Sequence, residues 1–165
     1  VDEAEYESLM EEIYKPLEHY EVNRNEITAG TVSPSYLLPI NGLQRLEKIM
    51  DEYVGGVTPH YMTNEPMMNR GLELLQMLKE DLQHLGADNL HQLQRAWELK
   101  HRVMASECVT QHTLFRKETR WPGYYYRGDH PKLDDKNWHC FTLSKYDQET
   151  DQYELEKAPV HHIID

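Results

Sequence analysis

Two neighbouring segments with helical apolar periodicity constrain the fold of this 165-residue chain more than any other feature. In residues 64–85 and again in residues 88–115, apolar side chains recur at spacings of three and four, as they do along one face of an amphipathic α-helix. Gly86 separates the two segments, and Asp88 or Asn89 is placed to cap the second. Long helices joined by a short turn predict antiparallel neighbours in a helical core.

The N-terminal segment has a weaker helical pattern. Asp2 followed by Glu5 is a capping-box start, and apolar residues recur at spacings of three and four as far as about residue 18. Because proline lacks an N–H and clashes with the preceding turn, Pro16 predicts that the last turn is bent or absent. Residues 2–18 are therefore predicted to form a helix that ends soon after this proline.

The remaining segments differ in character. Residues 21–41 show no sustained period and predict a long loop, whereas residues 41–53 predict a second, shorter helix. Residues 120–138 form an irregular stretch rich in aromatic side chains, glycine and proline, and the period-two pattern that follows predicts a small hairpin. In this pattern, Phe141 and Leu143 alternate on one side of a polar turn and Tyr153 and Leu155 on the other.

The expected fold is therefore mainly α. We predict an antiparallel three- to four-helix bundle over residues 1–119, followed over residues 120–165 by a long irregular aromatic loop, a small β-hairpin and a tail. The second part is expected to pack on the bundle, so that the whole chain makes one domain. Since the chain begins with Val1 and not with methionine, we expect it to be a processed form or a piece of something longer.

The charge balance restricts the partners. Twenty-nine acidic residues against 17 basic ones give a net charge of -12, which repels nucleic acids and anionic membranes. No run approaches the roughly 20 apolar residues that span a bilayer, so no membrane span is expected. The two cysteines, Cys108 and Cys140, lack the spacing of a disulfide framework or a zinc site, which favours a reducing, cytoplasmic location. We expect Cys108 to be a buried, unreactive thiol in a helix.

Motifs for chemistry are weak. Neither a G-x-G-x-x-G fingerprint nor a phosphate loop nor a nucleophile elbow occurs, so another polypeptide segment would have to hold any flavin or nucleotide. Three pairs have a helical metal-ligand spacing: Glu98 with His101, Asp81 with His84, and Cys108 with His112. A di-iron bundle needs two complete E-x-x-H pairs and two further glutamates, so solvated helix faces are the favoured interpretation. We predict neither a metal site nor a catalytic residue in this chain.

One region departs from the acidic charge. Residues 116–136 contain six bases and four acids, a net of +2, which leaves -14 for the rest of the chain. A basic, aromatic segment on an acidic helical body fits two interpretations. It is either a set of salt bridges within the chain or a docking surface for another domain.

The same region carries a family signature. A run of residues resembles the C-terminal signature of the succinate dehydrogenase and fumarate reductase flavoprotein family: Glu118, Thr119, Arg120, Arg127, Asp129, Pro131, Asp134, Asp135 and Trp138. The run from Arg120 to Arg127, with its WPGYYY centre, resembles one branch of that family, the alpha subunits of dissimilatory adenylylsulfate reductases. The stretches at 60–62, 69–71 and 94–99 are similar to the same branch, so the resemblance spans nearly the whole chain.

The resemblance implies a part of an oxidoreductase of dissimilatory sulfur metabolism and sulfate reduction. Enzymes of this branch interconvert adenosine 5'-phosphosulfate with AMP and sulfite, using FAD in the flavoprotein and iron-sulfur clusters on a beta subunit. This chain resembles only the C-terminal helical domain, so we expect it to be an inactive fragment without a cofactor of its own. Its implied partners are the FAD-binding domain of the same subunit and the beta subunit. The residues we expect at those interfaces are Arg120, Trp121, Tyr124, Tyr125, Tyr126 and Arg127.

Two other classes of function stay open from the sequence. The chain would alternatively be a free-standing acidic helical interaction module that binds a partner through the basic aromatic loop. A helical-bundle metalloenzyme is the third and weakest hypothesis. A coding sequence that continues upstream of Val1 into a G-x-G-x-x-G motif would favour the flavoprotein over the module.

Overall fold

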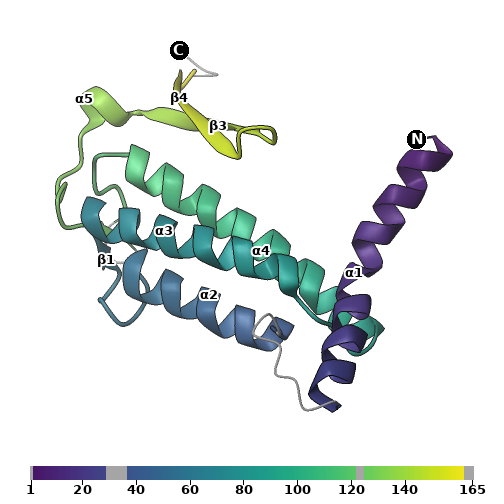
Figure 1. The fold of residues 1–165 in the computed structure, drawn as a ribbon. Coiled ribbons are helices and arrows are strands. Elements are labelled where there is room, and N and C mark those ends of the chain that lie inside the picture. The colour runs from purple at the N-terminus through teal and green to yellow at the C-terminus, as the bar shows by residue number, and fades with distance from the viewer. Residues whose placement is uncertain (1, 29–36, 122–124, 162–165) are drawn as a thin grey trace. The chain divides into compact units, whose positions relative to one another are not determined.

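The computed structural model describes residues 2–28, 37–121 and 125–161, without the side chains of residues 23 and 25–28. The predicted mainly α class with a small hairpin is confirmed (Figure 1). The helices are α1 (Glu3–Thr28), α2 (Pro39–Tyr53), α3 (Glu65–Asp81) with a 3-10 turn (Leu82–His84), α4 (Leu90–Phe115) and α5 (Asp135–Trp138). The strands are β1 (Met62–Thr63), β2 (Tyr126–Arg127), β3 (Cys140–Asp147) and β4 (Gln152–Pro159). No helix in these ranges is both long and apolar enough to cross a membrane.

The first helix is longer than the sequence predicts. The Asp2 carboxylate caps α1 by accepting a hydrogen bond from the Glu5 N–H at 2.8 Å, as expected. However, α1 continues through Pro16 to Thr28, so the predicted end near residue 18 is wrong. Pro16 is buried, and its carbonyl accepts a hydrogen bond from the Ala87 N–H at 2.8 Å. This packing offsets the local cost of an interior proline.

The predicted loop at 21–41 is correspondingly shorter. Its first residues belong to α1, and its last ones belong to α2, which begins at Pro39. Its central part, residues 29–36, lies outside the described residues.

The two long helices α3 and α4 agree closely with the sequence pattern. The Asn89 side chain caps α4 by accepting a hydrogen bond from the Gln92 N–H at 3.0 Å.

The chain divides into two compact units, each built from separated segments. Unit 1 consists of Val1–Leu46 and Gln76–Val103, and unit 2 consists of Glu47–Leu75 and Met104–Asp165. Helices α2, α3 and α4 therefore contribute one part to each unit. The boundary expected near residue 119 is untested by this division and stays a prediction.

Unit 1 has an apolar interior. Its buried hydrophobic residues are Leu46, Leu78, Leu82, Leu85, Ala87, Leu93, Ala96, Leu99 and Val103. Gly42 lets α2 approach α4 closely, since a Cβ at this position would lie 2.5 Å from Cδ2 of Leu99. Outside the interior, the Trp97 indole N–H donates to the Ile13 carbonyl at 3.1 Å, and Arg45 pairs with Asp81 at 2.5 Å on the surface.

Unit 2 has a mixed interior. Ile49, Val54, Met68, Leu75 and Trp138 are its buried hydrophobic residues, and the buried polar residues are Thr63, Thr110, Glu118, Thr119 and Arg127. Strands β1 and β2 form a short parallel pair in which Met62 lies beside Tyr126 and Thr63 beside Arg127. This pairing brings the segment before α3 against the aromatic loop that follows α4. It therefore anchors the region that carries the family signature.

The hairpin forms as predicted, and the apolar residues of its two strands lie on opposite faces. Strands β3 and β4 pair in antiparallel register, with Tyr146 opposite Tyr153. One face packs on α4 within unit 2, where the His112 ring nitrogen Nδ1 lies 3.1 Å from Oγ1 of Thr142. Phe141 and Leu143 lie on the other face of β3 and are 57% and 46% exposed. An alternating pattern separates two faces without saying which one is covered.

Cys108 is a further correction. The sequence predicts a buried thiol, whereas Cys108 is only partly buried and lies beneath the hairpin. Its Sγ is 3.8 Å from the hydroxyl of Ser144 in β3. The polar neighbour explains the difference, because this side of α4 faces the polar side chains of the hairpin and not the apolar interior.

Candidate functional site: a buried polar network at the end of α4

Arg127 occupies the centre of the network. Its side chain is fully buried. Its Nε and Nη2 donate to the two carboxylate oxygens of Asp129 at 2.8 and 2.7 Å, the bidentate geometry that suits a guanidinium. Its Nη1 donates to the carbonyls of Thr113 and Arg116 at 2.6 and 2.9 Å. Arg127 thus satisfies carbonyl groups that the end of α4 leaves without helical partners.

Glu118 forms the second centre. Glu118 is 1% exposed. Its carboxylate accepts hydrogen bonds from Arg116 Nη1 and from Arg120 Nε, both at 2.7 Å. The Asp134 N–H donates to its other oxygen at 2.9 Å. Arg116 also donates to the carbonyls of Trp138 and Cys140, at 2.9 and 2.8 Å. Hydrogen bonds from this many donors offset the free-energy cost of burying a charged carboxylate, which would otherwise destabilise the fold.

The donors determine the protonation of both carboxylates. Burial alone would raise the pKa of Glu118, but the hydrogen bonds from Arg120, the Asp134 N–H and Arg116 outweigh it and lower the pKa below 4.5. Hydrogen bonds from Arg127 lower the pKa of Asp129 far below 3.8 against the opposing effect of burial, and the Glu65 N–H contributes to this. Burial raises the pKa of Tyr125 to about 12. At neutral pH the two carboxylates are therefore charged and the phenol is neutral.

Backbone contacts join the two centres. The Thr119 hydroxyl accepts a hydrogen bond from the Arg127 N–H at 2.9 Å and donates one to the His130 carbonyl at 2.9 Å. The Asp134 carboxylate caps α5 by accepting a hydrogen bond from the Asn137 N–H at 3.2 Å. These bonds link Thr119, β2, His130 and α5 to one another. Salt bridges within the chain, one of the two interpretations of this basic segment, are therefore present.

Trp138 closes the network from the hairpin side. It is 7% exposed and meets the Phe115 ring edge-on, with 5.6 Å between the ring centroids. The Lys157 ammonium of β4 lies 3.4 Å from the centre of the Trp138 ring. Through this residue the hairpin is attached to the same end of α4 as Arg127 and Glu118.

The six interface residues predicted from the sequence occupy different environments. Trp121 is 70% exposed, and Tyr125 and Tyr126 are partly buried. Arg120 bridges Glu118 and Asp135 with a side chain that is 24% exposed, whereas Arg127 is entirely inside. Tyr124 lies outside the described residues. An interface role for these residues stays a prediction, and among the five that are described, Trp121 is the most exposed.

A hollow of about 280 Å³ lies beside the network in unit 2. Its lining combines Trp121 and Tyr125 with the charged groups of Arg116, Glu118 and Arg120 and with His112. The charged groups already bind one another, so the hollow offers an aromatic wall and few unused charges. Such a surface suits a protein contact better than a small charged substrate.

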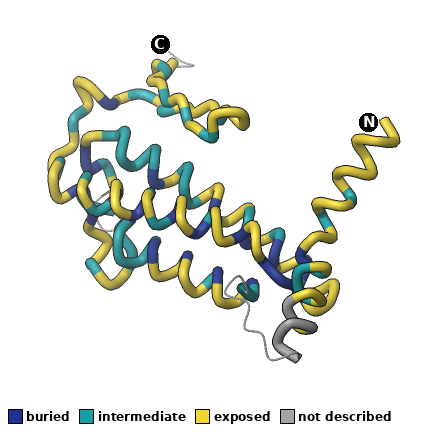
Figure 2. Tube along the Cα trace, viewed as in Figure 1, coloured by how far each residue is buried: buried dark blue, intermediate teal, exposed yellow. Residues whose placement is uncertain are grey.

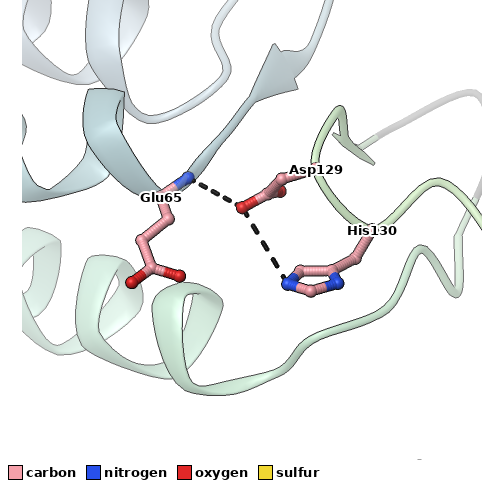
Figure 3. Close-up of side chains that lie close together, drawn as sticks. All are labelled: Glu65, Asp129 and His130. Carbon is pink, nitrogen blue, oxygen red and sulfur yellow. Dashed lines mark hydrogen bonds and ion pairs between the residues drawn. The ribbon is translucent and has the colours of Figure 1, made fainter.

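One group of side chains has the spacing of metal ligands. Glu65, Asp129 and His130 each place one ligand atom within 4.8 Å of the others (Figure 3). Both oxygens of Asp129 accept hydrogen bonds from Arg127, and an imidazole nitrogen of His130 is 4.0 Å from the carboxylate. A cation here would lie next to a buried guanidinium, which repels it. The geometry therefore argues for an anchored carboxylate and not for a metal centre.

This contact also shows what the sequence could not reveal. Glu65 is 64 positions from Asp129, and only the β1–β2 pairing brings them together. Nothing in the spacing of either residue signals the contact. The pairs with helical ligand spacing, among them Glu98 with His101, are not part of a group of three such side chains in the ranges that the structure describes.

Comparisons with known proteins identify the family of this chain. The model of the fumarate reductase flavoprotein C-terminal family matches residues 43–163. The chain is 42% identical to the adenylylsulfate reductase subunit alpha of Megalodesulfovibrio gigas over 96% of its length, and it covers 24% of that protein. It superposes on the adenylylsulfate reductase structure of Archaeoglobus fulgidus with a TM-score of 0.94 and 52% identity, covering all of this chain and 26% of the other.

A more distant structure shares the fold alone. The Sdh1 structure of Mycobacterium smegmatis has a TM-score of 0.71 and 19% identity, and this chain covers 25% of it. The chain thus spans about a quarter of the length of the relatives it matches. The residues of the buried network lie inside the matched family region. The chain belongs to the fumarate reductase flavoprotein C-terminal family, and within it resembles the C-terminal domain of the adenylylsulfate reductase alpha subunit.

Proposed function

We propose that this chain serves as the C-terminal helical domain of an FAD-dependent adenylylsulfate reductase, a cytoplasmic enzyme that interconverts adenosine 5'-phosphosulfate with AMP and sulfite. Identities of 42% and 52% to two adenylylsulfate reductases over nearly the whole chain support this proposal. In this role the chain contributes no group to the chemistry. The FAD is held by a part of the subunit outside this chain, and the iron-sulfur clusters belong to a beta subunit.

The domain acts as a scaffold that presents a docking surface. The observation that carries this role is the contrast between the buried network and Trp121, which is 70% exposed at its edge. Arg120, the neighbour of Trp121, binds Glu118 and Asp135, so the exposed ring follows directly on an anchored residue. Large exposed aromatic side chains are typical of interface hot spots. We assign Trp121 to the contact with the FAD-binding domain or with the beta subunit.

The test replaces Trp121 with alanine in the intact flavoprotein purified with its beta subunit. We expect W121A to lose flavin at least about tenfold faster on dilution, or to lose beta-subunit affinity by a similar factor, because a hot-spot aromatic contributes about 2 kcal/mol. V57A is the matched control, since Val57 is also 70% exposed in unit 2 and is not part of the network. If W121A keeps both flavin and beta subunit as the control does, the docking role is wrong.

A further inference from the structure

The first turns of α1 carry an apolar seam that the described part of the chain leaves largely uncovered. Tyr6 is 55% exposed and Leu9 is 50% exposed, while Met10 and Ile13 are partly buried. These four residues occupy positions i, i+3, i+4 and i+7, the spacing by which amphipathic helices insert into grooves. Figure 2 shows most of these turns as exposed. The seam is therefore arranged as a binding face.

The same turns are strongly and uniformly acidic. Six carboxylates and no basic residue occur in residues 2–14: Asp2, Glu3, Glu5, Glu7, Glu11 and Glu12. This segment alone thus accounts for -6 of the net charge of -12. Charge complementarity then requires basic side chains on the rim of a surface that receives this helix.

The hydrogen bonds that attach α1 to the rest of unit 1 begin at Ile13, the last residue of this seam. The Ile13 carbonyl accepts a hydrogen bond from Trp97, and the Pro16 carbonyl accepts one from Ala87. Residues 3–12 form about three helical turns, and a helix of this length is marginal in water without tertiary packing. Within the described residues, these turns are held by the continuation of α1 alone, so a surface that covers the seam would add stability to them.

We propose that residues 3–14 of α1 dock as a helix into an apolar groove with a rim of Lys and Arg, located on the remaining part of the same flavoprotein subunit. This inference rests on the proposed function. The relatives contain this chain within polypeptides about four times as long, so three quarters of the subunit is available at high effective concentration. A second copy of the chain is a poorer occupant, because two segments of charge -6 repel each other.

The experiment measures amide hydrogen exchange of residues 3–14 in the intact subunit. We expect L9D to speed this exchange about tenfold or more relative to wild type, since a carboxylate at the centre of the seam expels it from an apolar groove. V109D is the matched control, because Val109 is an aliphatic residue of α4 with 53% exposure against 50% for Leu9. The substitution Y6S tests the seam a second time without adding charge.

Ionic strength tests the basic rim. We expect a change from about 0.05 to 0.5 M salt to speed exchange of residues 3–14 in wild type and to have less effect in the E7Q/E11Q variant. The proposal is wrong if L9D exchanges like V109D, if salt has no effect, or if protection requires the beta subunit or rises with subunit concentration. None of these readings involves flavin. Normal exchange behaviour in W121A alongside flavin loss would therefore separate the two proposals.

Discussion

The two units of this small domain bury different kinds of side chain. Unit 1 excludes water with leucine, alanine and valine side chains, and its ion pair between Arg45 and Asp81 lies on the surface with side chains 44% and 51% exposed. Unit 2 buries a complete guanidinium and a complete carboxylate, Arg127 and Glu118, together with three threonines. All the buried polar residues of the described chain belong to unit 2.

The two units bury different side chains because they contain different kinds of backbone structure. Unit 1 consists largely of helices, which satisfy their own backbone groups, so apolar contacts suffice to hold them. Unit 2 must also fix the described residues between α4 and α5, where β2 is the only regular element. Side-chain donors and acceptors replace regular backbone partners there. The residues of the family signature are therefore largely those whose side chains hold this segment in place through buried hydrogen bonds and ion pairs.

The largest loss of stability is expected when the guanidinium of Arg127 is removed from the buried network. We expect R127M to lower the free energy of unfolding by about 3–5 kcal/mol, because it leaves the Asp129 carboxylate and several carbonyl groups of α4 without their donor. R45M removes the exposed cation of unit 1 and should cost less than about 1 kcal/mol. Urea unfolding of both variants measures the difference. Equal losses would mean that the buried network does not stabilise unit 2.

The sequence predicted the helices of both units better than the polar network. Apolar periodicity located α3 and α4, because this pattern reports directly which face is buried. It failed at Pro16, where a tertiary contact from Ala87 outweighs the local preference. Charged residues are solvent-exposed by default, so nothing in the sequence pattern places Arg127 inside. Its side-chain partners lie within 14 positions along the chain, but β2, which carries it, pairs with β1 more than sixty positions away, and no local pattern signals that pairing.

The second prediction concerns the apolar core of unit 1. Leu78 is fully buried, and we expect L78A to lower the free energy of unfolding by about 2–4 kcal/mol through lost contacts and a residual cavity. M77A is the control, because the adjacent Met77 is 54% exposed and should cost about 0.5 kcal/mol or less. The same urea titration compares them. A small loss in L78A would show that unit 1 depends on contacts other than its leucine core.

The third prediction uses pH to separate the units. The E118Q variant should lose about 2 kcal/mol at pH 7, because charge-assisted hydrogen bonds to Arg116 and Arg120 become neutral ones. In wild type the lowered pKa of Glu118 stabilises the fold above its unfolded value of 4.5, and this contribution is lost as the pH falls through the folded pKa. Wild type should therefore lose more stability than E118Q on acidification below about pH 4.5.

The control for this pH effect is an exposed carboxylate. Glu73 pairs with Arg70 through a side chain that is 64% exposed, so E73Q should keep the stability and the acid sensitivity of wild type. Chemical unfolding at several pH values from about 3 to 7 measures all three proteins. An E118Q profile parallel to that of wild type would contradict the assignment of acid sensitivity to Glu118.

The smallest expected effect comes from two glycines in helices, one in each unit. Alanine favours a helix over glycine by about 0.5–1 kcal/mol. In G42A the new Cβ meets Leu99 Cδ2 at 2.5 Å inside the apolar core of unit 1, and overpacking should outweigh that gain for a net loss of about 1 kcal/mol. In G71A the nearest atom is Tyr53 Cβ at 3.2 Å, so we expect almost no change. Thermal unfolding distinguishes them, and a stabilised G42A would show that the core of unit 1 yields more readily than its buried leucines suggest.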